Sequence, residues 1–282
     1  MIELRVAAKL VRSLLSATVT GCTIVCANSS LAMPHQPTSR WVVDYAADAC
    51  LLSRAYGSDE KPLMLSFEKL PMSSDVYVYV FKKTDRVDLN LGKAELRFSG
   101  DPKAAQVSFR AATMRKENLR RLMLGADIDL LERAAKSGSL LVDARGEVNE
   151  EFAVPNLGTA FAALDQCALD LGRGWGIPID EQNRMKEPAR SLEPIGKYFT
   201  SSSYPKAALD KDETGLAKVR ILIDAAGTPT DCTVVRASGS SSLDATTCRI
   251  FMKNIRFKPA TDAGGNALRS VYVMSVNWLI GD

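Results

Sequence analysis

The carboxyl-terminal third of the chain carries an ordered pattern that constrains the fold more than any other feature. Residues 218–224 and 268–279 alternate apolar and polar side chains, which is typical of half-buried strands. Gly227 lies in a hairpin loop where a positive φ is needed. The segment Ser241–Asp244 starts a helix with capping-box spacing, and Pro259 prevents that helix from continuing. Pro205 suits the first position of a short helix before these strands, and Gly215 ends it. The pattern therefore predicts the order helix, strand, strand, helix, strand.

The faces of the two strands follow from the same alternation. In the first strand Val219, Ile221 and Ile223 face inward, while Lys218 and Arg220 face outward. The last strand presents one apolar face as well. Its members are Tyr272, Met274, Val276 and Trp278.

Residues 198–282 resemble the C-terminal domain of TonB family proteins. The resemblance depends on the order and spacing of short motifs: Tyr204-Pro205, Gly227, Ser238-Gly239, Leu243-Asp244, Phe257-x-Pro259-Ala260 and Trp278. It implies a periplasmic binding module and no enzyme. In this family the strand after the helix takes the short box peptide of an outer-membrane receptor. Carried over to this chain, the binding edge is Val271, Tyr272, Val273, Met274, Ser275 and Val276.

Such a module works by β-augmentation. A strand at a sheet edge leaves a row of N–H and C=O groups unpaired, and an extended peptide can add there through main-chain hydrogen bonds. The alternative is a last strand that is covered by the first domain or by a second copy of the chain.

The first 32 residues are typical of an export signal. Arg5, Lys9 and Arg12 precede an apolar stretch over residues 13–27, and Ser30-Leu31-Ala32 forms a small-x-small cleavage site. The apolar stretch is shorter than the ~20 residues that cross a bilayer. We expect a periplasmic protein, with a retained membrane anchor and a lipoprotein modified at Cys22 as alternatives.

Four cysteines remain after cleavage, an even number that favours disulfides in an exported chain. Cys167 lies on the apolar stripe of the helix expected over residues 158–171. Cys248 lies on the helical stripe that faces the strand carrying Cys232. We therefore predict Cys50–Cys167 and Cys232–Cys248, the alternative being four buried free thiols.

The rest of the chain predicts an α+β fold in two domains. After a leader over residues 33–40, residues 41–176 form a first domain, 177–197 a proline-containing linker, and 198–282 the TonB-like domain. Short β-favouring runs separated by Gly and Pro come first. The run at residues 76–82 is apolar on both faces and predicts a strand that is central in a sheet or lies in a sandwich core. Helical patterns follow at residues 118–124, 128–135 and 158–171.

Charge and residue content give little support for nucleic-acid binding, catalysis or metal binding. The net charge is +3, and the basic cluster over residues 115–121 is read as an exposed helix face, so we expect no nucleic-acid partner. His35, the only histidine, lies in the leader, and we assign no catalytic residue, metal or cofactor. Asp127, Asp129 and Glu132 are read as the acidic start of a helix.

We therefore predict an exported adaptor that captures a protein or peptide, with an outer-membrane TonB-dependent receptor as the candidate partner. One alternative is a membrane-anchored energy transducer to such receptors, which requires the amino-terminal segment to be retained. The other is an enzyme whose site lies in residues 41–176. The sequence indicates no oligomeric state.

Overall fold

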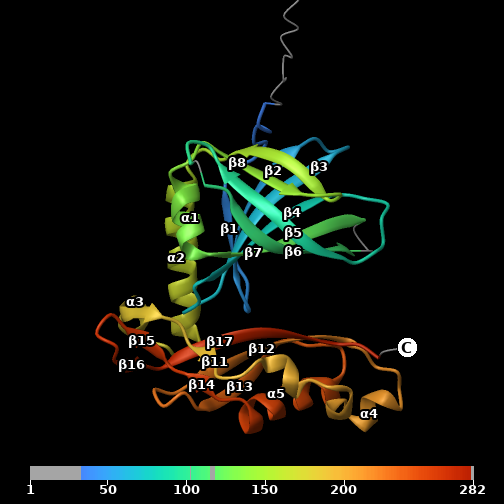
Figure 1. Cartoon of the computed structure of the whole chain (residues 1–282), viewed down its shortest axis with the longest axis vertical. Coiled ribbons are helices and arrows are strands. Elements are labelled where there is room, and N and C mark those ends of the chain that lie inside the picture. The colour runs from blue at the N-terminus through green and yellow to red at the C-terminus, as the bar shows by residue number, and fades with distance from the viewer. Residues whose placement is uncertain (1–32, 102, 115–117, 281–282) are drawn as a thin grey trace, which may run out of the picture. The chain divides into compact units, whose positions relative to one another are not determined.

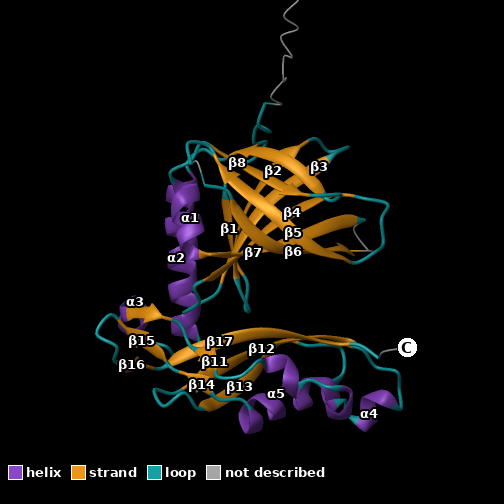
Figure 2. Ribbon diagram, in the orientation of Figure 1, coloured by secondary structure: helices purple, strands orange, loops and turns teal. Residues whose placement is uncertain are grey.

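The protein combines helices with antiparallel sheets, which confirms the predicted α+β class (Figures 1 and 2). The structure is a computed structural model. It describes residues 33–101, 103–114 and 118–280, without the side chains at positions 127, 128, 131 and 132. The residues from Met33 onward form one compact unit. The predicted signal, residues 1–32, lies outside the described residues.

Nine antiparallel strands form the largest sheet. Their order across the sheet is β1-β2-β3-β4-β7-β6-β5-β8-β9. The strands are β1 (Val42–Tyr45), β2 (Cys50–Gly57), β3 (Pro62–Lys69), β4 (Asp75–Lys83), β5 (Asn90–Phe98), β6 (Ala105–Met114), β7 (Leu119–Asp127), β8 (Ser139–Ala144) and β9 (Val148–Ala153).

Residues of the expected leader take part in this sheet. His35 forms a bridge with Phe152 of β9, and Pro37 forms one with Tyr56 of β2. The His35 N–H donates to the carbonyl oxygen of Glu151 at 2.7 Å. These bridges connect β9 to β2, so the segment belongs to the fold instead of preceding it.

One face of the nine-stranded sheet forms the main core. Val76, Val78 and Val80 of β4 are buried on it, and β4 pairs with β3 on one side and β7 on the other, as the two-sided apolar pattern predicts. The helices α1 (Ile128–Ala135) and α2 (Leu157–Gly174) pack against this core. The predicted disulfide Cys50–Cys167 is confirmed and joins β2 to α2.

The prediction of a helix over residues 118–124 is wrong, because residues 119–124 lie in β7. Leu122 and Leu124 fit a strand period as well as a helical one, and pairing with β4 and β6 decides between the two. The basic cluster is no exposed helix face either. Arg120 is buried and ion-paired with Glu147 at 2.7 Å, while Arg115 and Lys116 lie outside the described residues.

The carboxyl-terminal elements follow the predicted order of helix, two strands, helix and strand. A three-stranded sheet has the order β13-β12-β17, and α5 packs on one of its faces. Gly227 has the expected positive φ of 81° in the hairpin. The predicted disulfide Cys232–Cys248 is confirmed and joins β13 to α5. The elements are α4 (Lys206–Leu209), β12 (Gly215–Ile223), β13 (Pro229–Arg236), α5 (Ser241–Asn254) and β17 (Ser270–Trp278).

Residues 177–197 are folded and do not form the linker that we expect from their prolines. Pro178 precedes α3 and Pro194 precedes a 3-10 turn, so these prolines start short elements. Ile177 and Ile195 are buried in the carboxyl-terminal core. In addition, β10 pairs with β15 and β11 with β14, while β15 also pairs with β16. The elements are α3 (Ile179–Arg184), β10 (Met185–Glu187), β11 (Arg190–Ser191), η1 (Ile195–Tyr198), η2 (Ser201–Ser203), β14 (Phe257–Lys258), β15 (Ala260–Asp262) and β16 (Ala267–Leu268).

Candidate functional site

The last long strand, β17, lies at the edge of the three-stranded sheet. It pairs with β12 along its whole length, from Ser270 opposite Ile223 to Trp278 opposite Gly215. Within the described part of the chain, β12 is the only strand that pairs with it. The segment predicted as a binding edge, residues 271–276, occupies the middle of β17. Its outer flank therefore carries backbone N–H and C=O groups that no described strand satisfies.

The register between β12 and β17 assigns a face to each side chain, because residues directly opposite in a pair share a face. Met274 lies opposite Val219, so the alternate residues from Tyr272 to Trp278 share one face, as predicted from the sequence, and this is the face toward α5. Val273 and Ser275 lie opposite Arg220 and Lys218 and face the other way. An added strand would in turn direct alternate side chains to these two faces.

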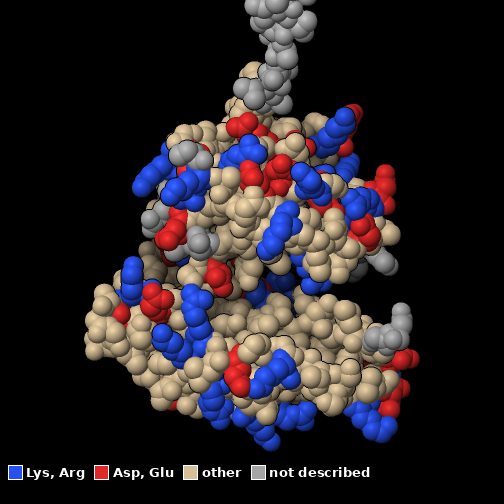
Figure 3. Space-filling model, in the orientation of Figure 1, with Lys and Arg blue, Asp and Glu red and all other residues tan. Residues whose placement is uncertain are grey.

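A groove of about 480 Å³ lies on the face of β17 that points away from α5, and we call it the intersheet groove. Its floor is the three-stranded sheet, with Lys218 of β12 and residues 271–275 of β17. Its roof is the outer face of the nine-stranded sheet. Figure 3 shows the molecule hollowed here, with Lys and Arg atoms inside the hollow. The roof residues used below are Tyr77, Tyr79, Arg110, Arg121 and Met123.

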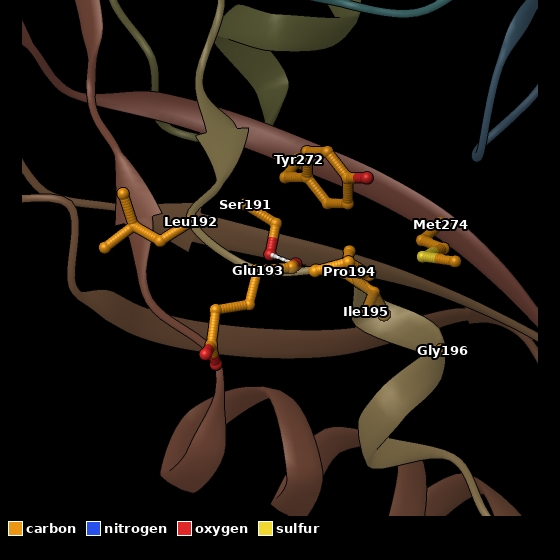
Figure 4. Close-up of a pocket in the computed structure, with 8 residues that line it drawn as sticks. All are labelled: Ser191, Leu192, Glu193, Pro194, Ile195, Gly196, Tyr272 and Met274. Carbon is orange, nitrogen blue, oxygen red and sulfur yellow. Dashed lines mark hydrogen bonds between the residues drawn. The ribbon is translucent and has the colours of Figure 1, made fainter.

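A second cavity, of about 520 Å³, lies on the α5 side of β17, and we call it the strap pocket. Tyr272 and Met274 form one wall and residues 191–196 form the other (Figure 4). The ring of Tyr272 also packs against Phe257, with 5.1 Å between the ring centroids. The Ser191 hydroxyl donates to the carbonyl oxygen of Glu193 at 2.6 Å and holds the turn of the segment. The free edge of β17 thus has a cavity on each face.

Buried ion pairs join the floor of the intersheet groove to its roof. The Lys218 ammonium lies 3.1 Å from Glu68 of β3 and 3.3 Å from Asp48, and Arg236 of β13 lies 2.7 Å from Asp48. Lys218 faces away from α5 as expected, yet only 8% of its side chain is exposed. The sequence did not indicate this burial, because the covering residues lie some 150 positions away.

Two tyrosines of the roof, Tyr77 and Tyr79, together with Tyr272, which borders both cavities, give the groove a polar but neutral lining. Burial, and then the negative charge of Asp75, raise the pKa of Tyr272. Burial also raises the pKa of Tyr77 and of Tyr79, and the Tyr79 hydroxyl donates to Glu68 at 2.6 Å. All three phenols therefore stay protonated at neutral pH. The hydroxyls of Tyr77 and Tyr272 can donate to a bound chain, whereas the single O–H of Tyr79 is already taken by Glu68.

The described residues include no group of His, Cys, Asp and Glu side chains arranged to hold a metal ion. Of the acidic residues singled out in the sequence, Asp129 is exposed, whereas the side chains of Asp127 and Glu132 lie outside the described residues. No helix of the described part has the length and apolar character to cross a membrane.

Comparison with known families gives one match. Residues 200–280 match the family described as Gram-negative bacterial TonB protein C-terminal. The chain carries a TonB C-terminal domain. This confirms the resemblance seen in the sequence and links the protein to TonB-related transport, in a family that is envelope-associated and non-enzymatic. No curated protein and no solved structure matches the chain.

Sequence reasoning located β17 but missed its surroundings. Arg110 and Arg121 belong to the first domain, and nothing in the local pattern indicates that they line a groove with the TonB C-terminal domain. The strap segment, residues 191–196, falls in the expected linker. Its one sequence signal is the apolar Leu192 and Ile195 among polar neighbours, which is unusual for a free linker.

Proposed function

We propose that this protein is an exported periplasmic adaptor whose TonB C-terminal domain captures an extended peptide or partner strand on the outer flank of β17. The peptide extends the three-stranded sheet, and its main chain pairs with residues 271–276. The candidate partner is an outer-membrane TonB-dependent receptor, which would contribute its short periplasmic box segment.

The edge position of β17 is the observation that carries this proposal. The outer flank of this nine-residue strand is covered by no strand that the structure describes, so its backbone groups are available to pair with an added strand. The strap pocket and the intersheet groove lie on the two faces of that flank. They provide places for the alternating side chains of the added strand, which is how augmented sheets obtain specificity.

Proline substitutions at adjacent positions test the proposal. Neighbouring residues in a strand direct their N–H groups to opposite sides, so either Met274 or Ser275 points its N–H to the open flank. Proline has no N–H. At the residue whose N–H points to the open flank, proline leaves every hydrogen bond to β12 intact, whereas at the neighbouring residue it removes one hydrogen bond to β12. We expect one of the variants Met274→Pro and Ser275→Pro to keep the wild-type Tm and lose peptide binding.

Binding is measured by fluorescence anisotropy with labelled box peptides from the TonB-dependent receptors of the same organism. A peptide with alternate backbone amides methylated serves as the matched ligand control, because it keeps the side chains and loses half of the main-chain donors. If both proline variants bind the unmodified peptide as the wild type does, β17 is not the capture site.

A further inference from the structure

Two ion pairs and a shared groove connect the nine-stranded sheet to the three-stranded sheet. The loop before β2 contacts β13 through Asp48 and Arg236, and β3 contacts β12 through Glu68 and Lys218. The next strands, β4 and β17, both border the intersheet groove, through Tyr77 and Tyr272. Beyond β4 the nine-stranded sheet continues with β7 and β6. Residues of these two strands line the intersheet groove together with residues 271–275 of β17.

Two arginines lie on β7 and β6 at this place. Arg110 of β6 is opposite Met123 of β7, and Arg121 lies two residues from Met123 on the same face. Such diagonal neighbours lie about 7–8 Å apart, within reach of one carboxylate for side chains as long as arginine. Both arginines line the intersheet groove.

Neither guanidinium has an ion-pair or hydrogen-bond partner among the residues that the structure describes. The Nε of Arg110 is buried without a partner, and the charge of Arg121 acts on Tyr79. The acidic groups of the groove are placed elsewhere. Glu68 is bonded to Lys218 and Tyr79, and the charge of Asp75 acts on Tyr77 and Tyr272 at β17 itself. The roof above the free flank is therefore positively charged.

We infer that the partner strand carries an Asp or Glu on the face toward the nine-stranded sheet, and that Arg110 and Arg121 bind its carboxylate. This inference rests on the proposed capture of a strand at β17 and adds which kind of side chain the captured strand carries. Arginine guanidinium groups bind carboxylates through paired N–H donors, which suits recognition of one side chain in an extended peptide. A Lys or Arg at the same peptide position is rejected by like charge.

A displayed library of random ten-residue peptides tests this on the full-length chain. Selections are run in parallel on the wild type, on Arg110→Gln/Arg121→Gln, on the proline variant of β17 that keeps its Tm, and on Arg145→Gln. Arg145 is exposed and does not line the groove, so its variant controls for the loss of one positive charge. The doubly lysine-substituted variant, Arg110→Lys/Arg121→Lys, keeps both charges and guards against a folding effect of glutamine.

We expect wild-type binders to share an acidic residue at one fixed position, and Arg145→Gln to select the same peptides. Changing that residue to Gln or Asn in a synthetic peptide should weaken binding about tenfold on the wild type and leave binding to Arg110→Gln/Arg121→Gln unchanged. The lysine variant should retain the acidic preference.

Binders without an acidic preference, or with the same preference on Arg110→Gln/Arg121→Gln, overturn the inference and leave capture at β17 intact. Binders that survive the proline substitution in β17, or a selection that yields none, overturn the proposed function together with it.

Discussion

Replacing Lys218 by methionine tests whether the TonB C-terminal domain is docked on the nine-stranded sheet as described. The side chain of Lys218 is 8% exposed, and those of its partners Glu68 and Asp48 are 14% and 9% exposed. Removing one member of such a buried ion-paired set costs about 3–5 kcal/mol, since the remaining charges stay desolvated. Here both carboxylates keep a partner, Tyr79 on Glu68 and Arg236 on Asp48. We therefore expect a loss near the lower end, about 3 kcal/mol.

Urea unfolding of the disulfide-bonded protein, followed by tryptophan fluorescence, measures this loss. With a slope of about 3 kcal/mol per molar, the midpoint should fall by about 1 M. Lys211→Met is the matched control, because Lys211 is exposed and its side chain has no described partner, so the midpoint should stay within about 0.2 M. The free energy of unfolding lost through Glu68→Gln should be smaller in the Lys218→Met background than in the wild type, as expected for coupled residues. A loss below about 1 kcal/mol for Lys218→Met would contradict the docking.

Three further predictions concern stability. Breaking Cys50–Cys167 by double alanine substitution should cost about 5 kcal/mol and breaking Cys232–Cys248 about 3 kcal/mol, since the separations are 117 and 16 residues; equal midpoint shifts in urea would count against this. The hydrogen bond from buried Arg120 lowers the pKa of Glu147, so its contribution is present above the unfolded pKa of about 4.3 and is lost as pH falls through the lower folded pKa. Glu147→Gln should cost about 3 kcal/mol at pH 7 and flatten the acid limb of a stability-against-pH curve, and an unchanged acid limb would refute the assignment. Gly227→Ala should lower the free energy of unfolding by about 2–3 kcal/mol, because φ is 81° and the new Cβ would lie 1.9 Å from a carbonyl oxygen; a wild-type Tm would contradict it.

The side-chain periodicity of single helices and strands correctly predicted which of their faces point to the core. The apolar stripe of α2 placed Cys167 toward the core, and the alternation in β12 and β17 placed their faces relative to α5. The same approach failed at residues 118–124, because Leu122 and Leu124 fit two periods and only pairing with β4 and β6 selects the strand.

The surroundings of the candidate site could not be predicted in this way. The burial of Lys218 depends on Glu68, and the groove roof depends on Arg110 and Arg121 of the first domain. Both arise from tertiary contacts over long stretches of chain. No periodicity or capping signal encodes such contacts, so a single sequence gives the edge strand but not the cavities that would give it specificity.

Amide hydrogen exchange along β17 tests most directly whether its outer flank is open and accepts a strand. In the free protein we predict that amides over residues 271–276 alternate between slow exchange, for those bonded to β12, and fast exchange, for those on the open flank. A selected peptide should slow the fast set and leave the slow set unchanged. Uniform protection in the free protein, or no slowing with peptide bound, would contradict the account.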